Sequence, residues 1–201
     1  MNHALQCRCG TLRGYVSRSR EINRCVCYCR DCQAFAHFLT QPREILDEDG
    51  GTDVVQMRAA NVTFTEGKEA LACMRLSPKG MLRWYAACCN TPVGNTLPSP
   101  KMSFVGLVHT CLEGGGATLD ESFGPVAARV NTDSTRGKVR SSSLATLAVI
   151  LRFIAMVARA RIDGSYKRSP FFSADTGAPV AEPKVLSRGE REELLKAVDA
   201  Q

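Results

Sequence analysis

The chain has 201 residues, of which 44% are hydrophobic and 23% charged. These proportions are ordinary for a globular protein and exclude a wholly disordered chain or a fibrous repeat. The formal net charge of +6 is too small to indicate nucleic-acid binding by itself. The length suffices for one domain with a buried core, or for one domain with an extension.

Cysteine is the unusual residue in this composition, with 10 copies that all lie at or before Cys111. A disulfide framework normally accompanies a secretory signal, and the first ten residues, MNHALQCRCG, show neither its apolar core nor its cleavage site. We therefore expect a cytoplasmic protein with reduced thiols, and clustered thiols in a reducing compartment usually bind metal. We also expect no apolar run of the about 18 residues that a membrane-spanning helix needs.

Short strand-like segments separated by turns predict an antiparallel, mainly β domain over residues 1–112. The turn sequence Ser-Pro-Lys-Gly at 77–80 predicts that the segments on either side of it form a hairpin. The expected strands are 12–16, 54–57, 62–65, 71–76, 81–85 and 105–110.

Residues 113–201 form an extension without cysteine. Its first part, 113–143, is expected to be loop with one short helix. The spacing of apolar residues then predicts a helix over 144–160 with Ser143 as its N-cap, and a capping box predicts a second helix over 187–199. The apolar face of the first helix consists of Leu144, Leu147, Leu151, Ile154 and Ala158.

The first of these helices has three interpretations. Packing on the β domain is the default, and a homodimer contact through 144–168 is the second. The third is an anionic membrane surface, because residues 129–168 carry nine basic residues and two acidic ones. We expect no sequence-specific nucleic-acid partner, since no base-reading motif accompanies the basic residues.

Two cysteine motifs near the N-terminus have the spacing of metal ligands. Cys7-Arg-Cys9-Gly10 supplies two thiols, and a C-x-C-x-x-C run supplies three more from Cys27, Cys29 and Cys32. Zinc in structural sites takes four ligands, and a C-x-x-C turn makes two thiolates converge on one ion. Cys25, on the same strand face as Cys27, is held in reserve as either a ligand or a buried residue.

A late pair, Cys88 and Cys89, can complete the ligand count. With Cys7 and Cys9 it closes a site of four thiolates, whereas the C-x-C-x-x-C run forms a site of three with a position open for water or substrate. The expectation is therefore about two zinc ions per chain. Adjacent residues point to opposite sides of a regular strand, so one cysteine of the pair could serve each site, or only one could ligate.

Three thiolates around zinc carry a net negative charge. Arg30 or another nearby cation could offset it. The two remaining cysteines, Cys73 and Cys111, are expected to be inert core residues, because a lone buried cysteine behaves as a small hydrophobe.

In this order, the motifs resemble the family of the glutathione-dependent formaldehyde-activating enzyme and centromere protein V. That family's pattern is an early C-x-C-G, a central C-H-C-x-x-C-R and a late F-C-x-x-C-G-T, and the resemblance covers residues 5–112. It implies a zinc-bound β-tent of small antiparallel sheets, a structural zinc held by the early and late pairs, and a second zinc at the central motif. It also implies carbon–sulfur lyase activity on a thiol adduct of the glutathione type.

The chain departs from this pattern at three positions. In register, the first cysteine of the late pair falls at Ala86. Either Cys88 substitutes after a local shift of the backbone, or the structural site has three protein ligands or borrows Cys25. Tyr28 stands in place of the family's histidine, and Gln33 in place of the following arginine.

Two classes of function fit these residues. In the first, the chain is a carbon–sulfur lyase with Cys27, Cys29 and Cys32 at the reacting centre and His37 as a candidate proton shuttle. In the second, both metal sites are structural and the basic extension binds a partner or a membrane surface. Three thiolates with an open position favour the enzyme, and a fourth ligand favours the structural module.

Overall fold

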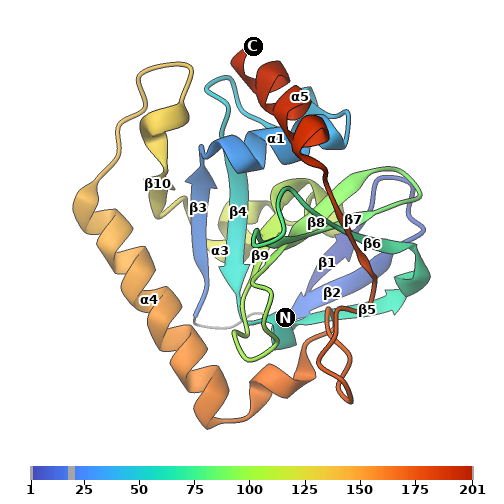
Figure 1. Cartoon of the computed structure of the whole chain (residues 1–201). Coiled ribbons are helices and arrows are strands. Elements are labelled where there is room, and N and C mark those ends of the chain that lie inside the picture. The colour runs from blue at the N-terminus through green and yellow to red at the C-terminus, as the bar shows by residue number, and fades with distance from the viewer. Residues whose placement is uncertain (1, 18–20, 201) are drawn as a thin grey trace.

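The computed structural model describes residues 2–17 and 21–200 (Figure 1). They fold into two β-sheets with helices packed around them, and helix accounts for 35% of the residues against 28% for strand. The expected mainly β class is therefore corrected to a mixed α/β class. Most of the helical residues lie in the extension, and two α-helices, Arg30–Phe38 and Pro42–Ile45, lie within the first 112 residues.

The larger sheet has the strand order β10-β3-β4-β9-β8-β7-β6-β11. Among the described residues of 1–112, every strand pairing is antiparallel, as expected. The two edge strands, β10 and β11, come from the extension and run parallel to their neighbours. Its strands are β3 (Asn23–Cys27), β4 (Thr52–Met57), β6 (Leu71–Arg75), β7 (Leu82–Ala86), β8 (Thr91–Thr96), β9 (Val105–Val108), β10 (Ala128–Val130) and β11 (Pro183–Val185).

The smaller sheet consists of β1 (Asn2–Gln6), β2 (Arg13–Ser17) and β5 (Val62–Glu66), all antiparallel. Gly14 on β2 lies so close to β5 that an added Cβ would come within 2.0 Å of the backbone oxygen of Thr63. Only glycine allows this close approach, which lets β5 pair with β2.

The expected hairpin around residues 77–80 is confirmed, with Cys73 on β6 opposite Trp84 on β7. Strands β2, β4, β5 and β9 also fall on expected segments. β8 was missed because its sequence, TPVGNT, contains proline, glycine and asparagine, which are poor strand formers. Its burial between β7 and β9 overrides that preference.

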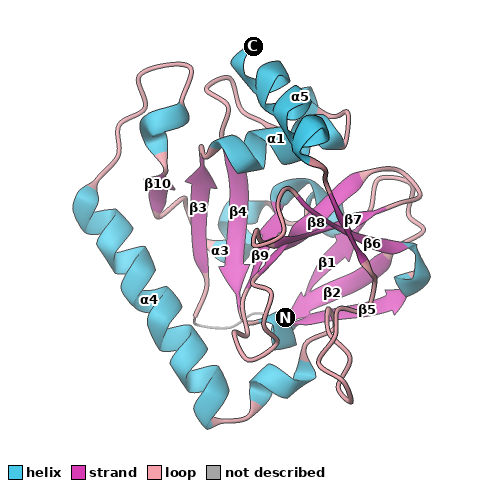
Figure 2. Cartoon of the chain, viewed as in Figure 1, coloured by secondary structure: helices cyan, strands magenta, loops and turns pink. Residues whose placement is uncertain are grey.

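Helices pack at one end of the large sheet and along one of its edges (Figure 2). They are α1 (Arg30–Phe38), α2 (Pro42–Ile45), α3 (Leu119–Phe123), α4 (Ser143–Ile162) and α5 (Arg188–Asp199). Six short 3-10 helices cover Ala59–Asn61, Lys68–Ala70, His109–Cys111, Glu113–Gly115, Thr132–Ser134 and Ser165–Arg168.

Helix α4 runs along the β10–β3 edge of the sheet (Figure 1). Its N-cap is Ser142, one residue before the expected cap, and the residues buried on it are Val149, Met156, Val157 and Ala160. The apolar face expected to pack on the domain points away from it instead, with Leu144 80% and Leu151 57% exposed.

The length and composition of α4 contradict the expectation that no apolar segment reaches the length of a membrane-spanning helix. By those two properties alone the helix is long and apolar enough to cross a membrane, although only 22% of its apolar window is buried.

Helix α5 packs on α1 at the top of the view in Figure 2. The predicted capping box is present, with Ser187 and Glu190 each bonding the other's backbone N–H. Arg30 on α1 donates to Asp199 on α5 at 2.6 Å. The division of the chain at residue 112 stays a prediction; strands from both sides of it share the large sheet.

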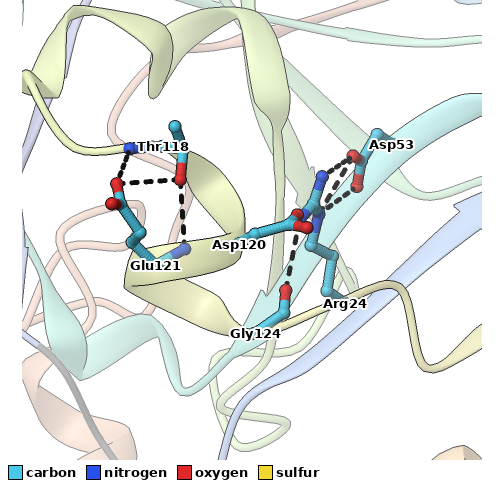
Figure 3. A network of polar contacts seen from close by, with 6 residues as sticks. All are labelled: Arg24, Asp53, Thr118, Asp120, Glu121 and Gly124. Carbon is cyan, nitrogen blue, oxygen red and sulfur yellow. Dashed lines mark hydrogen bonds and ion pairs between the residues drawn. The ribbon is translucent and has the colours of Figure 1, made fainter.

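Arg24 on β3 joins α3 to the large sheet (Figure 3). Its guanidinium donates to Asp53 on β4 at 2.7 Å and to the carbonyl of Gly124 at 3.1 Å, and it forms an ion pair with Asp120 on α3. Thr118 caps the N-terminus of α3 in the same view. A charged side chain thus fixes a segment of the extension to the sheet.

The main core lies between the two sheets. Trp84 is fully buried there and packs on Phe171 with ring centroids 5.2 Å apart. Cys73 and Cys111 are buried in the same cluster, in agreement with the expectation for these two residues.

Candidate metal centres

Four cysteines from two distant turns meet beside the smaller sheet and are called here the four-cysteine site. Cys7 follows β1 and Cys9 lies in the turn after it, which Gly10 closes with a positive φ of 77°. Cys88 and Cys89 occupy the turn between β7 and β8. The expectation that these two pairs form one site is matched in space, since their four sulfurs lie within 4.8 Å of one another.

The sulfur spacing of the four-cysteine site fits a tetrahedral ion. Cys9 and Cys88 have Sγ atoms 3.3 Å apart, Cys7 lies 3.5 Å from Cys9 and 3.7 Å from Cys88, and Cys88 lies 3.8 Å from Cys89. Zinc–sulfur bonds of about 2.3 Å in a tetrahedron place sulfurs about 3.8 Å apart. The group can therefore hold a metal ion with little movement.

The turn explains how adjacent cysteines reach the same centre. Cys88 and Cys89 are not in a strand, where their side chains would point to opposite faces. The turn instead ends at Asn90, whose φ is 55°, a left-handed conformation that asparagine tolerates better than most residues. Ala86, the position that the resemblance aligned with a first cysteine, lies on β7, and Cys88 is the residue whose sulfur joins the group.

The thiols of this site differ in their acidity. Hydrogen bonding to the hydroxyl and backbone of Thr11 lowers the pKa of Cys9 to about 6. Burial raises the pKa of Cys88 to about 12 and also raises the pKa of Cys7. Burial also acts on Cys89, but hydrogen bonds with Thr91 and the Cys9 backbone outweigh it and lower the pKa of that thiol. Cys9 and Cys89 thus ionise more readily than an ordinary thiol, whereas a bound cation would favour ionisation of Cys7 and Cys88.

The second group, called here the three-cysteine site, forms where β3 leads into α1. Cys27 is the last residue of β3, Cys29 is the N-cap of α1, and Cys32 lies in the first turn of that helix. Cys27 Sγ is 3.5 Å from Cys29 Sγ and 3.8 Å from Cys32 Sγ. A thiol as N-cap, accepting from the Cys32 N–H at 3.4 Å, starts the helix while the other two sulfurs face it.

A buried arginine accompanies the three-cysteine site, and the sequence had not identified it. Arg83 on β7 is 3% exposed, and its Nη1 lies 3.8 Å from Cys32 Sγ and 3.1 Å from Asn95 Oδ1 on β8. The expected counter-charge, Arg30, is instead paired with Asp199 at the protein surface. Arg83 follows Cys32 by 51 residues, so only the folded sheet brings them together.

Cys25 and His37, two other candidates for the three-cysteine site, lie outside the group of converging sulfurs. The thiol of Cys25 accepts a hydrogen bond from Gln56 Nε2 at 3.2 Å, and burial raises its pKa to about 12. Cys25 is not among the three sulfurs that converge, and it lines the neighbouring cavity instead. His37 lies near the C-terminal end of α1 and is not among the residues lining that cavity.

The two residues that depart from the family pattern have structural contacts. Tyr28 is buried and its hydroxyl donates to Asp47 Oδ2 at 3.0 Å. Gln33 donates from Nε2 to the carbonyls of Tyr28 and Ser134, both at 2.9 Å. These side chains hold the loops around the three-cysteine site.

A cavity of about 220 Å³ opens beside the three-cysteine site. Asn131, which follows β10 in a left-handed conformation, donates from Nδ2 to Cys27 Sγ at 3.3 Å at its rim. The cavity is lined by Cys25, Cys27, Cys29, Cys32, Val54, Gln56, Met81, Arg83, Asn95, Phe104, Gly106, Val130 and Asn131.

Fold and sites together define a mixed α/β protein with two groups of cysteines that could each hold a metal ion. Residues 2–184 match the profile of a family of unknown function, DUF6151, and the chain belongs to that family. No curated protein matches the chain. A Rhodobacter sphaeroides protein of known crystal structure is similar at a TM-score of 0.38 and 16% identity, over 59% of this chain and 93% of that one.

Proposed function

We propose that this chain is a zinc protein in which the four-cysteine site is structural and the three-cysteine site binds a thiol adduct, with carbon–sulfur lyase activity. One observation carries this proposal: the three-cysteine site has three converging sulfurs, opens on a cavity and has a buried cation at its side. Three protein ligands and an accessible position are typical of catalytic zinc, and four ligands of structural zinc.

The donor set favours zinc. Thiolates are soft ligands, and tetrahedral sets of them select zinc or iron–sulfur clusters. The resemblance to the glutathione-dependent formaldehyde-activating enzyme and centromere protein V supports zinc at both positions. When bound at the three-cysteine site, zinc would supply a Lewis-acid position for the sulfur or oxygen of an adduct.

The protein's own groups have distinct parts in this proposal. Arg83 places a positive charge beside Cys32 and offsets the negative charge of three thiolates. Asn95 accepts from the guanidinium and fixes its direction, and Asn131 donates to Cys27 and orients that sulfur. In the reaction, the adduct's C–S bond breaks, its hydroxyl proton passes to the sulfur, and a free thiol and an aldehyde leave.

Metal analysis and turnover test the proposal together. Protein purified anaerobically without chelator should contain about two zinc ions per chain and cleave a hemithioacetal of formaldehyde and a thiol. Absence of metal would overturn the proposal of a zinc protein. Two zinc ions without cleavage of any adduct, and without any effect of thiols on the metal, would favour a purely structural module.

We further propose that the outer face of α4 binds an anionic membrane surface, in a cytoplasmic protein. Helical spacing places Arg152 and Arg159 on one side of the exposed apolar stripe and Arg161 on the other. Arginines that flank an apolar face suit a helix lying at the interface of an anionic bilayer. Because Val149 and Met156 pack on the protein, α4 would lie on the bilayer and would not cross it.

Vesicle flotation tests this surface. The chain should float with vesicles containing phosphatidylglycerol, float weakly with phosphatidylcholine alone, and lose part of its binding in high salt. A stable dimer in the absence of lipid, with no flotation, would assign the same face to a second copy of the chain and overturn the membrane proposal.

A further inference from the structure

We infer that the ligand of the three-cysteine site is a thiol, or thiol adduct, with an uncharged apolar group, and that a charged peptide thiol such as glutathione is disfavoured. This inference rests on the proposed function and narrows it. Its basis is a second cavity that extends the first one toward α4.

The two cavities adjoin each other. The second has a volume of about 340 Å³ and shares five lining residues with the cavity at the cysteines: Gln56, Met81, Phe104, Val130 and Asn131. A ligand whose sulfur lies at the three-cysteine site therefore has space for its remaining atoms in the direction of α4. The volume of the second cavity falls within the range of small-molecule sites, which is about 300–1,000 Å³.

The lining of the second cavity is uncharged and mostly apolar. Besides the shared residues it consists of Leu97, Thr146, Val149, Ile150 and Phe153. Among the described residues, Arg83 is the one cation that lines either cavity, and it is already directed at Cys32 and Asn95.

Glutathione is poorly suited to this space. It carries two carboxylates and an amino group, and burying charges without a partner is costly. The amides of Gln56 and Asn131 can accept or donate single hydrogen bonds to a ligand, but they cannot neutralise a carboxylate. An alkyl or aryl group gains free energy on entering the same space, because its apolar surface leaves water.

The wall of the second cavity comes from the extension. Ile150 and Phe153 lie on α4, and Phe153 packs edge-on against Phe104 with ring centroids 5.2 Å apart. Phe104 precedes β9, so the aromatic pair joins α4 to the central strands. Residues 113–201 therefore shape the specificity of a site whose sulfurs all lie within the first 32 residues.

Thiol binding to the cobalt-loaded protein tests the inference without depending on turnover. Cobalt(II) replaces zinc in thiolate sites, and its visible absorption changes when a further sulfur ligand binds. We expect benzyl mercaptan to bind about tenfold more tightly than 2-mercaptoethanol, which has a similar thiol without the ring. Glutathione should bind no more tightly than 2-mercaptoethanol.

A pair of neighbouring substitutions gives a matched control. Ile150→Asp places a charge in the cavity lining and should weaken benzyl mercaptan about tenfold while leaving 2-mercaptoethanol unchanged. Leu151→Asp alters the next residue of the same helix, which is 57% exposed and lines neither cavity, and should change neither affinity. Circular dichroism verifies that both variants fold.

The outcomes separate the two proposals. Glutathione binding as tightly as benzyl mercaptan, or equal effects of the two substitutions, would overturn the inference and leave the proposed function intact. A cobalt spectrum that no thiol changes would overturn the open site itself, and the inference with it. The thiol series on the unaltered chain decides the question even if the Ile150 variant fails to fold.

Discussion

Nη1 of Arg83 lies 3.8 Å from the Sγ of Cys32, and both residues are buried. Hydrogen bonding with the Cys27 and Cys29 thiols, together with the Arg83 charge, holds the pKa of Cys32 well below its usual value. A buried cation beside a buried thiol stabilises the thiolate form, which is the form that binds metal. Arg83, on a strand of the large sheet, therefore favours the thiolate form of a ligand in the three-cysteine site.

Removing this charge should weaken metal binding at one site only. Arg83→Met keeps the apolar stem and should lower the zinc affinity of the three-cysteine site about 10- to 100-fold. The four-cysteine site should retain its ion. Competition with a chromogenic chelator measures both affinities.

Arg30→Met is the control for Arg83→Met, because Arg30 is close in sequence to the cysteines but pairs with Asp199 instead. It should leave both affinities unchanged. Equal loss in the two variants would show that the position of Arg83 has no special effect on the metal.

Loss of single cysteines should distinguish a structural site from an open one. Cys88→Ser should release one zinc ion and lower the melting temperature, because the four-cysteine site joins two distant turns. Cys29→Ser should release the other ion, abolish adduct cleavage and lower the melting temperature less. Cys73→Ser, at a buried residue outside both sites, should keep two ions and the activity.

These three variants need metal content, melting temperature and turnover measured on the same samples. Parallel losses of activity in all of them would show that folding, and not the three-cysteine chemistry, is being measured.

The Arg24 network should contribute strongly to stability. Arg24→Met leaves Asp53 without its partner and Asp120 without its ion pair, and should lower the free energy of unfolding by about 3 kcal/mol. Arg188→Met removes an exposed pair with Glu192 and should cost about 0.5 kcal/mol or less. Urea denaturation of the metal-loaded protein compares them, and equal costs would contradict the assigned role of Arg24.

The exposed apolar face of α4 should control vesicle binding. Leu147→Asp places a charge on a side chain that is 51% exposed and should reduce flotation with anionic vesicles about tenfold. Val180→Asp introduces the same charge at an exposed aliphatic residue away from α4 and should leave flotation unchanged. Unchanged flotation of the Leu147 variant would count against the membrane surface.

The Glu190 carboxyl in the capping box of α5 should titrate at a lower pH than an ordinary glutamate. A hydrogen bond from the Ser187 N–H, helped by Lys184, lowers the pKa of Glu190 to about 2. Since the folded pKa lies below the unfolded value of about 4.3, the cap stabilises the helix above that pH and is lost as the pH falls toward about 2. Carbon-13 shifts of the Glu190 carboxyl follow this directly, and a midpoint near about 4.3 would contradict it.

Local patterns in the sequence were sufficient to predict several parts of the fold and of the candidate sites. The capping box at Ser187, the hairpin around residues 77–80 and the ligand spacing of the C-x-C-x-x-C run each depend on residues a few positions apart. Such signals hold because turn geometry and helix capping are decided by neighbouring backbone atoms. The same reasoning missed α1, since its N-cap is the thiol of Cys29 and not one of the usual capping side chains.

The tertiary structure decided what depends on distant partners. Both Cys88 and Cys89 join the four-cysteine site because a turn, and not a strand, carries them. Arg83 becomes the counter-charge because the fold brings its guanidinium on β7 to Cys32 on α1, 51 residues earlier in the chain. Helix α4 buries the face opposite to its most apolar one. Sequence alone determined which residues can ligate a metal, whereas long-range packing determined their neighbours, because contacts between distant segments leave no local pattern.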